Sequence, residues 1–241
     1  MLKIAAISDT HNYHYLIPEF KEINSLGEDK EPLSGDILIH AGDATFWGDM
    51  KETETFLKWY GELNFKHIIF TPGNHDRYFE QNPTDARKMC EDNNVILLNH
   101  EAITLEGIKF FGSPYTPWYN DYAFNRARTL SESMLRRIPW IKDDWATMPE
   151  DINVLITHGP PLYILDELTT FQGTPLGQFL GCADLRDAVE RIRPDLHFFG
   201  HIHQGHGQKH QEGISFYNVA ICTWIGGPLN PVTILDYELE T

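Results

Sequence analysis

Residues 66–76 read Lys-His-Ile-Ile-Phe-Thr-Pro-Gly-Asn-His-Asp, an apolar run that ends in a tight turn carrying an amide, an imidazole and a carboxylate. Ile68–Phe70 has the composition of a buried strand, and Pro72-Gly73 turns the chain directly after it. A turn that only reversed the chain would more commonly use Asn-Gly or Asp-Gly. The stretch therefore predicts a strand whose end presents polar side chains for chemistry.

The same arrangement recurs at four other places in the chain. Short runs rich in Ile, Leu, Val or Phe each precede polar residues, which together are Asp9 and His11, Asp43, Asn74 with His75, His158, and His201 with His203. Carboxylate, amide oxygen and imidazole are ligand types that suit Mn, Fe and Zn. Residues i and i+2 of an extended segment share a side, so Asp9 and His11 are expected to face one ion, and His201 and His203 are expected to point to the same side of their segment. The set is large enough for two adjacent ions, which Asp43 could bridge with one oxygen to each.

Strands and helices alternate along the first half of the chain, which predicts βαβ units with a mainly parallel sheet. Strands are expected at 3–8, 36–41, 66–71, 95–98, 103–105, 109–112, 152–157, 195–200, 215–220 and 232–238. Apolar residues at helical spacing predict helices at 50–63, 83–92, 131–148 and 184–193, and Pro139 is expected to kink or break the third. Later strands follow one another without helices, so we expect two packed sheets covered by helices, in one domain over residues 1–241.

Composition narrows the class of protein. The 241 residues are 41% hydrophobic and carry a net charge of −16, which is typical of a globular chain and argues against a stable nucleic-acid complex. The three cysteines show no zinc-knuckle spacing and predict reduced thiols, hence a cytoplasmic protein. We expect no signal peptide and no membrane attachment, since no stretch approaches the ~20 apolar residues of a span.

Five blocks in order along the chain carry a family resemblance. They are Asp-x-His at 9–11, Gly-Asp at 42–43, Gly-Asn-His-Asp at 73–76, His-Gly-Pro-Pro at 158–161 and Gly-His-x-His at 200–203. Together they resemble the calcineurin-like metallophosphoesterase superfamily, over about residues 4–220. Residues 38–43, 112–114, 123–125 and 158–161 are most similar to small metallophosphoesterase-domain proteins related to class III cyclic nucleotide phosphodiesterases. The resemblance implies an α/β fold, a four-layer α/β/β/α sandwich.

The resemblance also implies a ligand set and a mechanism. One divalent ion would be held by Asp9, His11, Asp43 and His203, and the other by Asp43, Asn74, His158 and His201. The expected metals are Mn, Fe or Zn, with Mg and Co as further options. A hydroxide bridging the ions would attack phosphorus, while Asn74 and His75 offset the developing charge and His75 protonates the leaving oxygen. In such relatives a carboxylate often orients this histidine, and Asp76 and Asp49 are the candidates here.

The expected substrate is a small phosphodiester, with a nucleotide favoured, such as a 2′,3′- or 3′,5′-cyclic one. The aromatic-rich residues 110–128 either cover the core or, with Phe46 and Trp47, form a wall that stacks on a base. A protein phosphatase is not expected, because Pro72 stands where that branch has an arginine. Arg77 and Arg126 are alternatives for phosphate contact, although ordinary ion pairs are favoured for both.

Other functions remain open at this stage. A broad-specificity phosphatase, a nucleotide pyrophosphatase or a nuclease would use the same metal centre and differ in the pocket. A metal-stabilised binding module is the alternative from another class. The complete ligand set counts against that module, and so does the expectation that no apolar helix is exposed.

Overall fold

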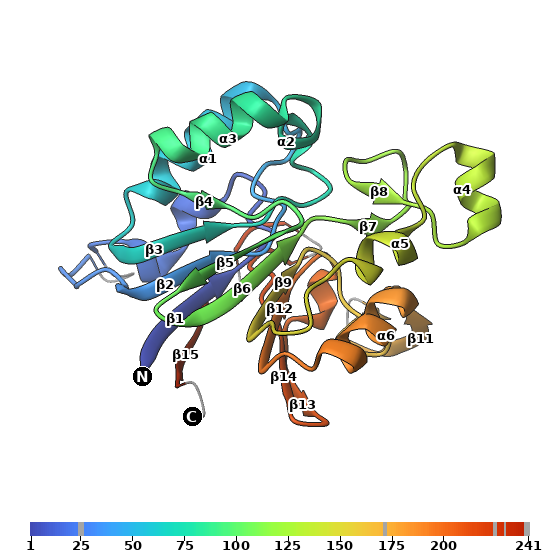
Figure 1. Cartoon of the computed structure of the whole chain (residues 1–241). Helices are drawn as coiled ribbons and strands as arrows, with labels where there is room; N and C mark the ends of the chain where they lie inside the picture. The colour runs from blue at the N-terminus through green and yellow to red at the C-terminus, as the bar shows by residue number, and fades with distance from the viewer. Residues whose placement is uncertain (24–26, 171–172, 224–225, 229, 239–241) are drawn as a thin grey trace.

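The computed structural model describes residues 1–23, 27–170, 173–223, 226–228 and 230–238 (Figure 1). Its strands are β1 (Leu2–Ile7), β2 (Gly35–His40), β3 (Phe65–Phe70), β4 (Ile96–Leu97), β5 (Glu101–Leu105), β6 (Ile108–Ser113), β7 (Thr116–Pro117), β8 (Asn125–Arg126), β9 (Val154–Thr157), β10 (Glu167–Thr169), β11 (Pro175–Phe179), β12 (Leu196–Phe199), β13 (Gly207–Gln211), β14 (Ile214–Asn218) and β15 (Thr233–Tyr237). Its α-helices are α1 (Met50–Gly61), α2 (Arg77–Gln81), α3 (Pro83–Asp92), α4 (Leu130–Arg136), α5 (Ile141–Ala146) and α6 (Ala183–Ile192), and its 3-10 helices are η1 (His14–Leu16), η2 (Pro18–Phe20) and η3 (His203–Gly205).

Two mixed sheets form the centre of the molecule. The first has the strand order β15-β1-β2-β3-β4, in which β1 to β4 are parallel and β15 is antiparallel. The second has the order β13-β14-β12-β9-β6-β5, in which β14, β12, β9 and β6 are parallel. Their antiparallel neighbours β13 and β5 close the two edges. Each sheet thus has a parallel core, as the alternating pattern of the first half predicts for the first sheet.

Three apolar cores separate four layers. Alternation along β1 places Ile4 and Ala6 in the core shared by the two sheets, while Ala5 and Ile7 face the other way, toward α1 and α3. The outer face of the second sheet packs on α5 and α6, with Trp145 at the centre of that core. Helices α1 and α3 cover the outer face of the first sheet, as α5 and α6 cover that of the second, whereas α4 projects away from the sheets (Figure 1). The four-layer α/β/β/α sandwich is therefore confirmed.

The expected helix over 131–148 is two short helices. Pro139 lies between α4 and α5, where the pyrrolidine ring removes a backbone donor and ends the helical pattern. Only the second helix faces the core: α5 buries its apolar side chains, whereas α4 buries none. The side chains of Leu130, Met134 and Leu135 are 57%, 75% and 82% exposed. The expectation that no apolar helix is exposed is therefore wrong.

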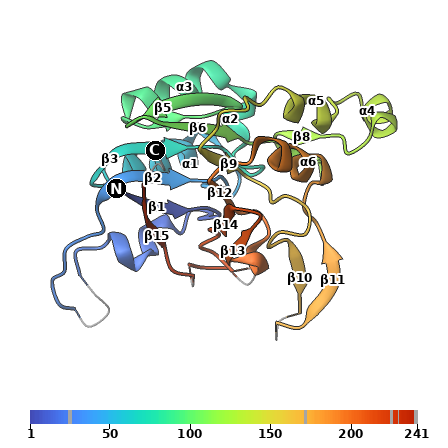
Figure 2. The ribbon, with the colours of Figure 1, turned by 60° about the horizontal axis from the view of Figure 1, so that its bottom comes forward.

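Several elements have no apolar signal in the sequence. β13 reads Gly-Gln-Lys-His-Gln, yet it pairs with β14 in the register Gln211↔Ile214. That register leaves a two-residue turn, Glu212-Gly213, with both φ angles positive (55° and 81°), which is the conformation that matches strand twist in a hairpin. The β10–β11 hairpin projects from the body in Figure 2, and the residues of β11 are exposed. Periodicity does not detect such strands because they bury little.

A membrane-crossing helix would need more length and apolar character than any helix in the described part of the chain has.

His197 on β12 is a buried ionisable group whose titration is expected to set part of the acid sensitivity of the fold. Burial lowers the pKa of His197 from 6.5 to about 3, and its Nε2 contacts Thr157 Oγ1 at 2.8 Å. Below pH 6.5 the unfolded chain binds the proton first, so the free energy of unfolding falls as pH drops from about 6.5 toward 3. The slope is about 1.4 kcal/mol per pH unit for this one group.

Urea unfolding of the wild type and of His197→Phe at pH 7 and pH 5 isolates this contribution. Between these pH values the wild type is expected to lose about 2 kcal/mol more than the variant. An identical pH dependence in the two proteins would show that His197 does not carry the effect.

Candidate metal centre

The carboxyl ends of parallel strands bring the sequence-predicted ligands together. Asp9 and His11 follow β1, Asp43 follows β2, and Asn74 with His75 follow β3, all in the first sheet. His158 follows β9, and His201 with His203 follow β12, in the second sheet. A bridge between Ser8 and Ala220 joins the loops of the two sheets at this end. Side chains separated by almost two hundred positions thus meet at one edge of the sandwich.

The donor atoms of the predicted ligands form two groups, and a third group with metal-ligand spacing joins His11, Asp43 and His75. In the first group, His203 Nε2 lies 3.2 Å from Asp9 Oδ1 and 3.3 Å from His11 Nε2. In the second group, His158 Nε2 lies 3.3 Å from Asp43 Oδ2 and 2.9 Å from Asn74 Oδ1. Donor atoms of Asp9, His11 and His203 lie within 4.8 Å of one another, and so do those of Asp43, His158 and His201. Such spacing is compatible with one cation in each group.

Asp43 lies between the two groups. Its Oδ2 is 3.9 Å from His11 Nε2 and 3.3 Å from His158 Nε2, so one oxygen faces both. Its Oδ1 accepts a 2.8 Å hydrogen bond from the backbone N–H of His75. One oxygen of Asp43 thus faces both donor groups, while the other is engaged by the backbone.

Backbone carbonyls set the tautomers of the imidazoles. His158 Nδ1 lies 2.9 Å from the carbonyl of Ala41, and His11 Nδ1 lies 3.2 Å from that of Thr45. A ring that donates through Nδ1–H keeps a lone pair on Nε2, which is the form that binds a metal ion. Both rings thus present Nε2 to the centre, and the donor chemistry of the site fits divalent cations.

The electrostatics of the site also fit a bound cation. Burial would raise the pKa of Asp9, but the adjacent His203 holds it well below its usual range. Burial lowers the pKa of His158, but the Asp43 carboxylate outweighs it and raises that pKa to about 9. Two buried carboxylates therefore draw positive charge onto their neighbours. A divalent cation would supply that charge at the same place.

The loops that carry the ligands adopt a costly backbone conformation. The φ angles of Asp9, His11, Asp43 and His201 are 51°, 42°, 56° and 66°, in the left-handed region that non-glycine residues rarely occupy. β1 ends at Ile7, so Asp9 and His11 do not converge through strand alternation, and that part of the sequence argument is wrong. Left-handed turns after the strands direct these side chains inward.

Close approach of the loops explains a glycine in the Gly-Asn-His-Asp block. A Cβ on Gly73 would lie 2.3 Å from Asp43 Oδ1 and 2.7 Å from His158 Cε1. No side chain fits there without displacing a ligand.

Asp76 ties the Asp43 loop to the Asn74 loop. One carboxylate oxygen accepts hydrogen bonds from the N–H groups of Asp43 (2.9 Å) and Gly73 (2.7 Å), and the other accepts from Thr45 N–H (3.0 Å) and Oγ1–H (2.7 Å). Burial, together with the nearby Asp43, raises the pKa of Asp76 to about 6. Both oxygens are occupied by the loops, so the structure does not support Asp76 as the group that orients the His75 ring. Asp49 instead caps α1.

Removing the Asp76 carboxylate is expected to destabilise the fold. Asp76→Ala leaves buried N–H donors without acceptors, at a cost of about 1–3 kcal/mol for each such group. We expect a total loss of at least about 3 kcal/mol in the free energy of unfolding by urea. The exposed Asp187→Ala is the matched control, with an expected change within about 0.5 kcal/mol. Equal stability of the two variants would rule out the structural role of Asp76.

A cavity of about 340 Å³ opens above the two groups. Its described lining is His11, Tyr13, Asp43, Phe46, Asn74, His75, Tyr119, Tyr122, His201, His203, Cys222, Thr223 and Gly226. The Tyr122 ring lies 4.6 Å from the His75 ring, and Tyr119 is stacked 6.3 Å from Tyr122. Among these lining residues there is no lysine or arginine. The cavity therefore combines metal-ligand side chains with aromatic walls.

The aromatic side chains of residues 110–128 divide between the core and the cavity, and Trp47 is not among the described residues that line the cavity. Tyr122 and Tyr119 line the cavity, whereas Phe124 is buried and Tyr115 packs against that core. Trp118 lies under the guanidinium of Arg136, 3.2 Å from the ring centroid. The loop covers the core with part of its aromatics and walls the cavity with the rest.

The two candidate phosphate-binding arginines have other contacts. Arg126 Nε donates to Asp144 at 2.9 Å, and its guanidinium lies 3.7 Å from the Tyr115 ring centroid. The guanidinium carbon of Arg77 lies 5.2 Å from the ring centroid of Tyr122. Neither contributes to the lining of the cavity.

Sequence reasoning missed part of the cavity lining. Tyr13, Thr223 and Gly226 belong to no motif, and the cysteine spacing predicts only reduced thiols. All three cysteines are free and buried, yet Cys222 also lines the cavity, with Sγ 3.5 Å from the carbonyl of Thr10. No local pattern identifies these residues, because they reach the cavity from loops of unrelated sequence.

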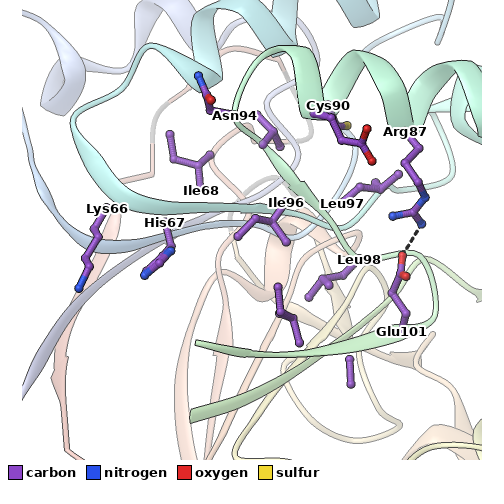
Figure 3. A pocket seen from close by; sticks show the side chains of 14 residues that line it. Lys66, His67, Ile68, Arg87, Cys90, Asn94, Ile96, Leu97, Leu98 and Glu101 are labelled. Carbon is purple, nitrogen blue, oxygen red and sulfur yellow. Dashed lines mark hydrogen bonds and ion pairs between the residues drawn. The ribbon is translucent and has the colours of Figure 1, made fainter. Parts of the chain in front are cut away.

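A second cavity of about 550 Å³ lies at the edge of the two sheets, between β4, β5 and α3 (Figure 3). Its floor is mostly aliphatic, and Arg87 pairs with Glu101 at its side. Lys66 and His67 both contact Glu106, at 2.8 Å. It contains none of the predicted ligands, and its charges compensate one another, so the chemistry is assigned to the cavity above the metal-ligand groups.

Comparison with known proteins agrees with this geometry. The sequence pattern of the family Calcineurin-like phosphoesterase matches residues 2–205. The chain belongs to this family. It is 33% identical over 224 residues to human metallophosphoesterase domain-containing protein 1, covering 84% of its own length and 64% of the human protein, slightly under two thirds. It is also 32% identical over 237 residues to UPF0046 protein K07C11.7 of Caenorhabditis elegans, covering 92% of this chain and 70% of that protein.

A solved structure shares the fold of this phosphoesterase. The phosphopantetheinyl hydrolase PptH of Mycobacterium tuberculosis aligns with a TM-score of 0.56 and 18% identity, over 92% of this chain and 89% of that one. At this identity the likeness supports the fold alone. The family match and the sequence relatives confirm the family resemblance inferred from the motifs.

Proposed function

We propose that this phosphoesterase hydrolyses small phosphodiesters at a dinuclear metal centre, with nucleotides, including 2′,3′- and 3′,5′-cyclic nucleotides, as the favoured substrates. The observation that carries the proposal is the joint geometry of the cavity. Two donor groups share the Asp43 oxygen at its floor, and aromatic rings form its wall.

The ligand sets follow the two donor groups. Asp9, His11, Asp43 and His203 would hold one divalent ion, and Asp43, Asn74, His158 and His201 the other. The nitrogen and oxygen donors suit Mn, Fe or Zn, with Mg and Co as further options. When bound, two such ions would activate a water molecule and offset charge on the phosphoryl oxygens. Both sheets contribute ligands, which supports treating residues 1–241 as one domain.

The other polar groups of the cavity have distinct tasks. The Asn74 side chain reaches the second donor group through Oδ1 and can donate through its amide nitrogen to a phosphoryl oxygen. His75 lines the cavity with Nδ1 held by the Phe46 carbonyl at 2.8 Å. That leaves Nε2 to deliver a proton to the leaving oxygen as the P–O bond breaks.

Charge favours a diester over a monoester. A phosphodiester carries one negative charge, whereas a phosphomonoester carries close to two at neutral pH. The extra charge would need cationic side chains, and the described lining of the cavity offers no lysine or arginine. Phe46, Tyr119 and Tyr122 instead provide ring faces on which a nucleobase can stack.

The cavity favours three other enzyme functions less than hydrolysis of small phosphodiesters. A broad-specificity phosphatase, a nucleotide pyrophosphatase or a nuclease would use the same centre. A metal-stabilised binding module is the second candidate, and one observation favours it: α4 exposes Leu130, Met134 and Leu135. That surface lies on a separate helix and is compatible with an active centre.

Hydrolysis of a phosphodiester panel tests the proposal. The chelated and the Mn-reconstituted protein are compared on bis-nitrophenyl phosphate, the nitrophenyl monoester, and 2′,3′- and 3′,5′-cyclic nucleotides. We expect diester turnover to exceed monoester turnover and to vanish with chelator. A preference for the monoester would indicate a phosphatase. If the metal-bound protein hydrolyses none of these substrates, the binding module would be favoured.

A further inference from the structure

The loop of residues 45–48 connects β2 to α1 and borders the cavity through Phe46. The exposed Trp47 ring packs against Phe46, with ring centroids 4.9 Å apart. A loop with so little buried apolar surface needs another source of order.

A single carboxylate oxygen holds residues 46–48 of this loop. Glu52 Oε2 accepts hydrogen bonds from the backbone N–H groups of Phe46 (3.1 Å), Trp47 (2.8 Å) and Gly48 (3.0 Å). The backbone of Glu52 is fixed in turn, because its N–H donates to the helix cap Asp49 at 2.9 Å. The Glu52 side chain therefore extends from the first turn of α1 back to the loop, where one of its oxygens accepts hydrogen bonds from three consecutive backbone N–H groups.

The same peptide groups reach the candidate site on their other side. The Trp47 N–H and the Phe46 carbonyl belong to one peptide group, and that carbonyl lies 2.8 Å from His75 Nδ1. The Phe46 N–H and the Thr45 carbonyl belong to the preceding peptide group, and that carbonyl lies 3.2 Å from His11 Nδ1. Negative charge at the N–H end of a peptide polarises its carbonyl and strengthens the bond the carbonyl accepts.

Packing fixes the loop against the His75 backbone. Gly48 has φ +71°, and a Cβ there would lie 2.1 Å from the carbonyl oxygen of His75 and 2.4 Å from Arg77 N. The loop cannot move outward without losing its Glu52 contacts, and it cannot move inward without a clash.

We propose that Glu52 is a positioning residue that orients His75, and secondarily His11, through these two peptide groups. The role rests on the function proposed above for His75. The Glu52 carboxylate thus orients the candidate acid His75 through an intervening peptide group, without touching the ring. The ring, protonated on both nitrogens and held through Nδ1–H by the Phe46 carbonyl, gives its Nε2 proton to the leaving oxygen. The oxygen of the attacking hydroxide forms its bond to phosphorus as the ester P–O bond breaks, and the ring is left neutral.

The experiment compares Glu52→Ala and Glu52→Gln with Glu54→Gln, which alters an exposed glutamate on the same helix. Three quantities are measured on each metal-loaded protein: amide hydrogen exchange of residues 46–48, metal affinity, and kcat on diesters with a nucleoside or a nitrophenolate leaving group. The nitrophenolate needs little protonation, so it reports on the centre without the acid.

Glu52→Ala is expected to accelerate amide exchange in the loop and to lower kcat for the nucleoside leaving group about 10–100-fold, as loss of such supporting contacts does. The loss on the nitrophenolate is expected to be several times smaller. Glu52→Gln retains an acceptor without the charge, so an intermediate effect is expected, and this isosteric variant serves if the alanine variant does not fold. Metal affinity is expected to fall through His11, whereas Glu54→Gln is expected to match the wild type.

The outcomes separate this inference from the proposed function. If the wild type turns over diesters but the Glu52 variants keep slow amide exchange, or lose activity equally on both leaving groups, the positioning role is overturned and the function stands. If the wild type turns over none of the substrates, the proposed function fails. Amide exchange of the loop and metal affinity then still test whether Glu52 holds the loop. The catalytic role proposed for His75 is rejected together with the proposed function.

Discussion

Asp43→Asn is expected to lower kcat for phosphodiester hydrolysis by at least about 100-fold, more than the effect typical of residues that only support a ligand. The asparagine has nearly the same shape but a single acceptor oxygen. If that oxygen keeps the His75 N–H bond, the amide NH2 faces His11 and His158, where Oδ2 stands in the wild type. If the amide group instead rotates so that its oxygen faces His11 and His158, the His75 N–H loses its acceptor. Either way, both donor groups lose their shared charge.

The measurement pairs turnover with metal content by elemental analysis. Asp187→Asn on α6 is the control, because it removes the same charge from an exposed position away from the cavity. We expect the Asp43 variant to bind less metal and the control to bind as much as the wild type. Turnover of Asp43→Asn close to that of the wild type would remove Asp43 from the bridging role.

His75→Ala is expected to produce the second large effect, and the effect should depend on the leaving group. General acid catalysis typically contributes about 10²–10⁴-fold, so hydrolysis of a diester with a nucleoside leaving group should slow by that range. Nitrophenolate leaves readily without a proton, and a loss of less than about 10-fold is expected there. The structure supports this role because Nδ1 is engaged by the Phe46 carbonyl at 2.8 Å and the ring lines the cavity.

His100→Ala is a useful comparison for the His75 variant. His100 is a partly buried histidine whose ring nitrogens contact Ser113 and Thr147 outside the cavity, so its removal should affect stability more than leaving-group dependence. Equal losses on both leaving groups in His75→Ala would contradict the acid role. They would suggest that His75 acts on the metal centre itself, near which its ring lies.

Local sequence determined the parallel cores of the sheets. Runs such as Ile37–Ile39 and Ile68–Phe70 are apolar on both sides, which is the pattern of a strand covered on both faces, and β2 and β3 are such strands. The position of each polar motif directly after a run is also a local property, and it was sufficient to name the residues that meet at the edge of the sandwich. The polar strand β13 was missed because its pairing depends on a turn and a neighbour, not on its own apolar residues.

The tertiary structure alone decided how the named residues are used. Asp9 and His11 converge through left-handed turns, not through strand alternation, because interlocking loops hold their φ angles at 51° and 42°. Asp76 lies beside His75 in the sequence, yet it holds two loops together, while the more distant Glu52 holds the loop whose Phe46 carbonyl contacts His75. The sequence by itself determines which carboxylate, amide and imidazole groups are available for chemistry. The direction in which they point depends on contacts between distant segments, which form only when both sheets have packed.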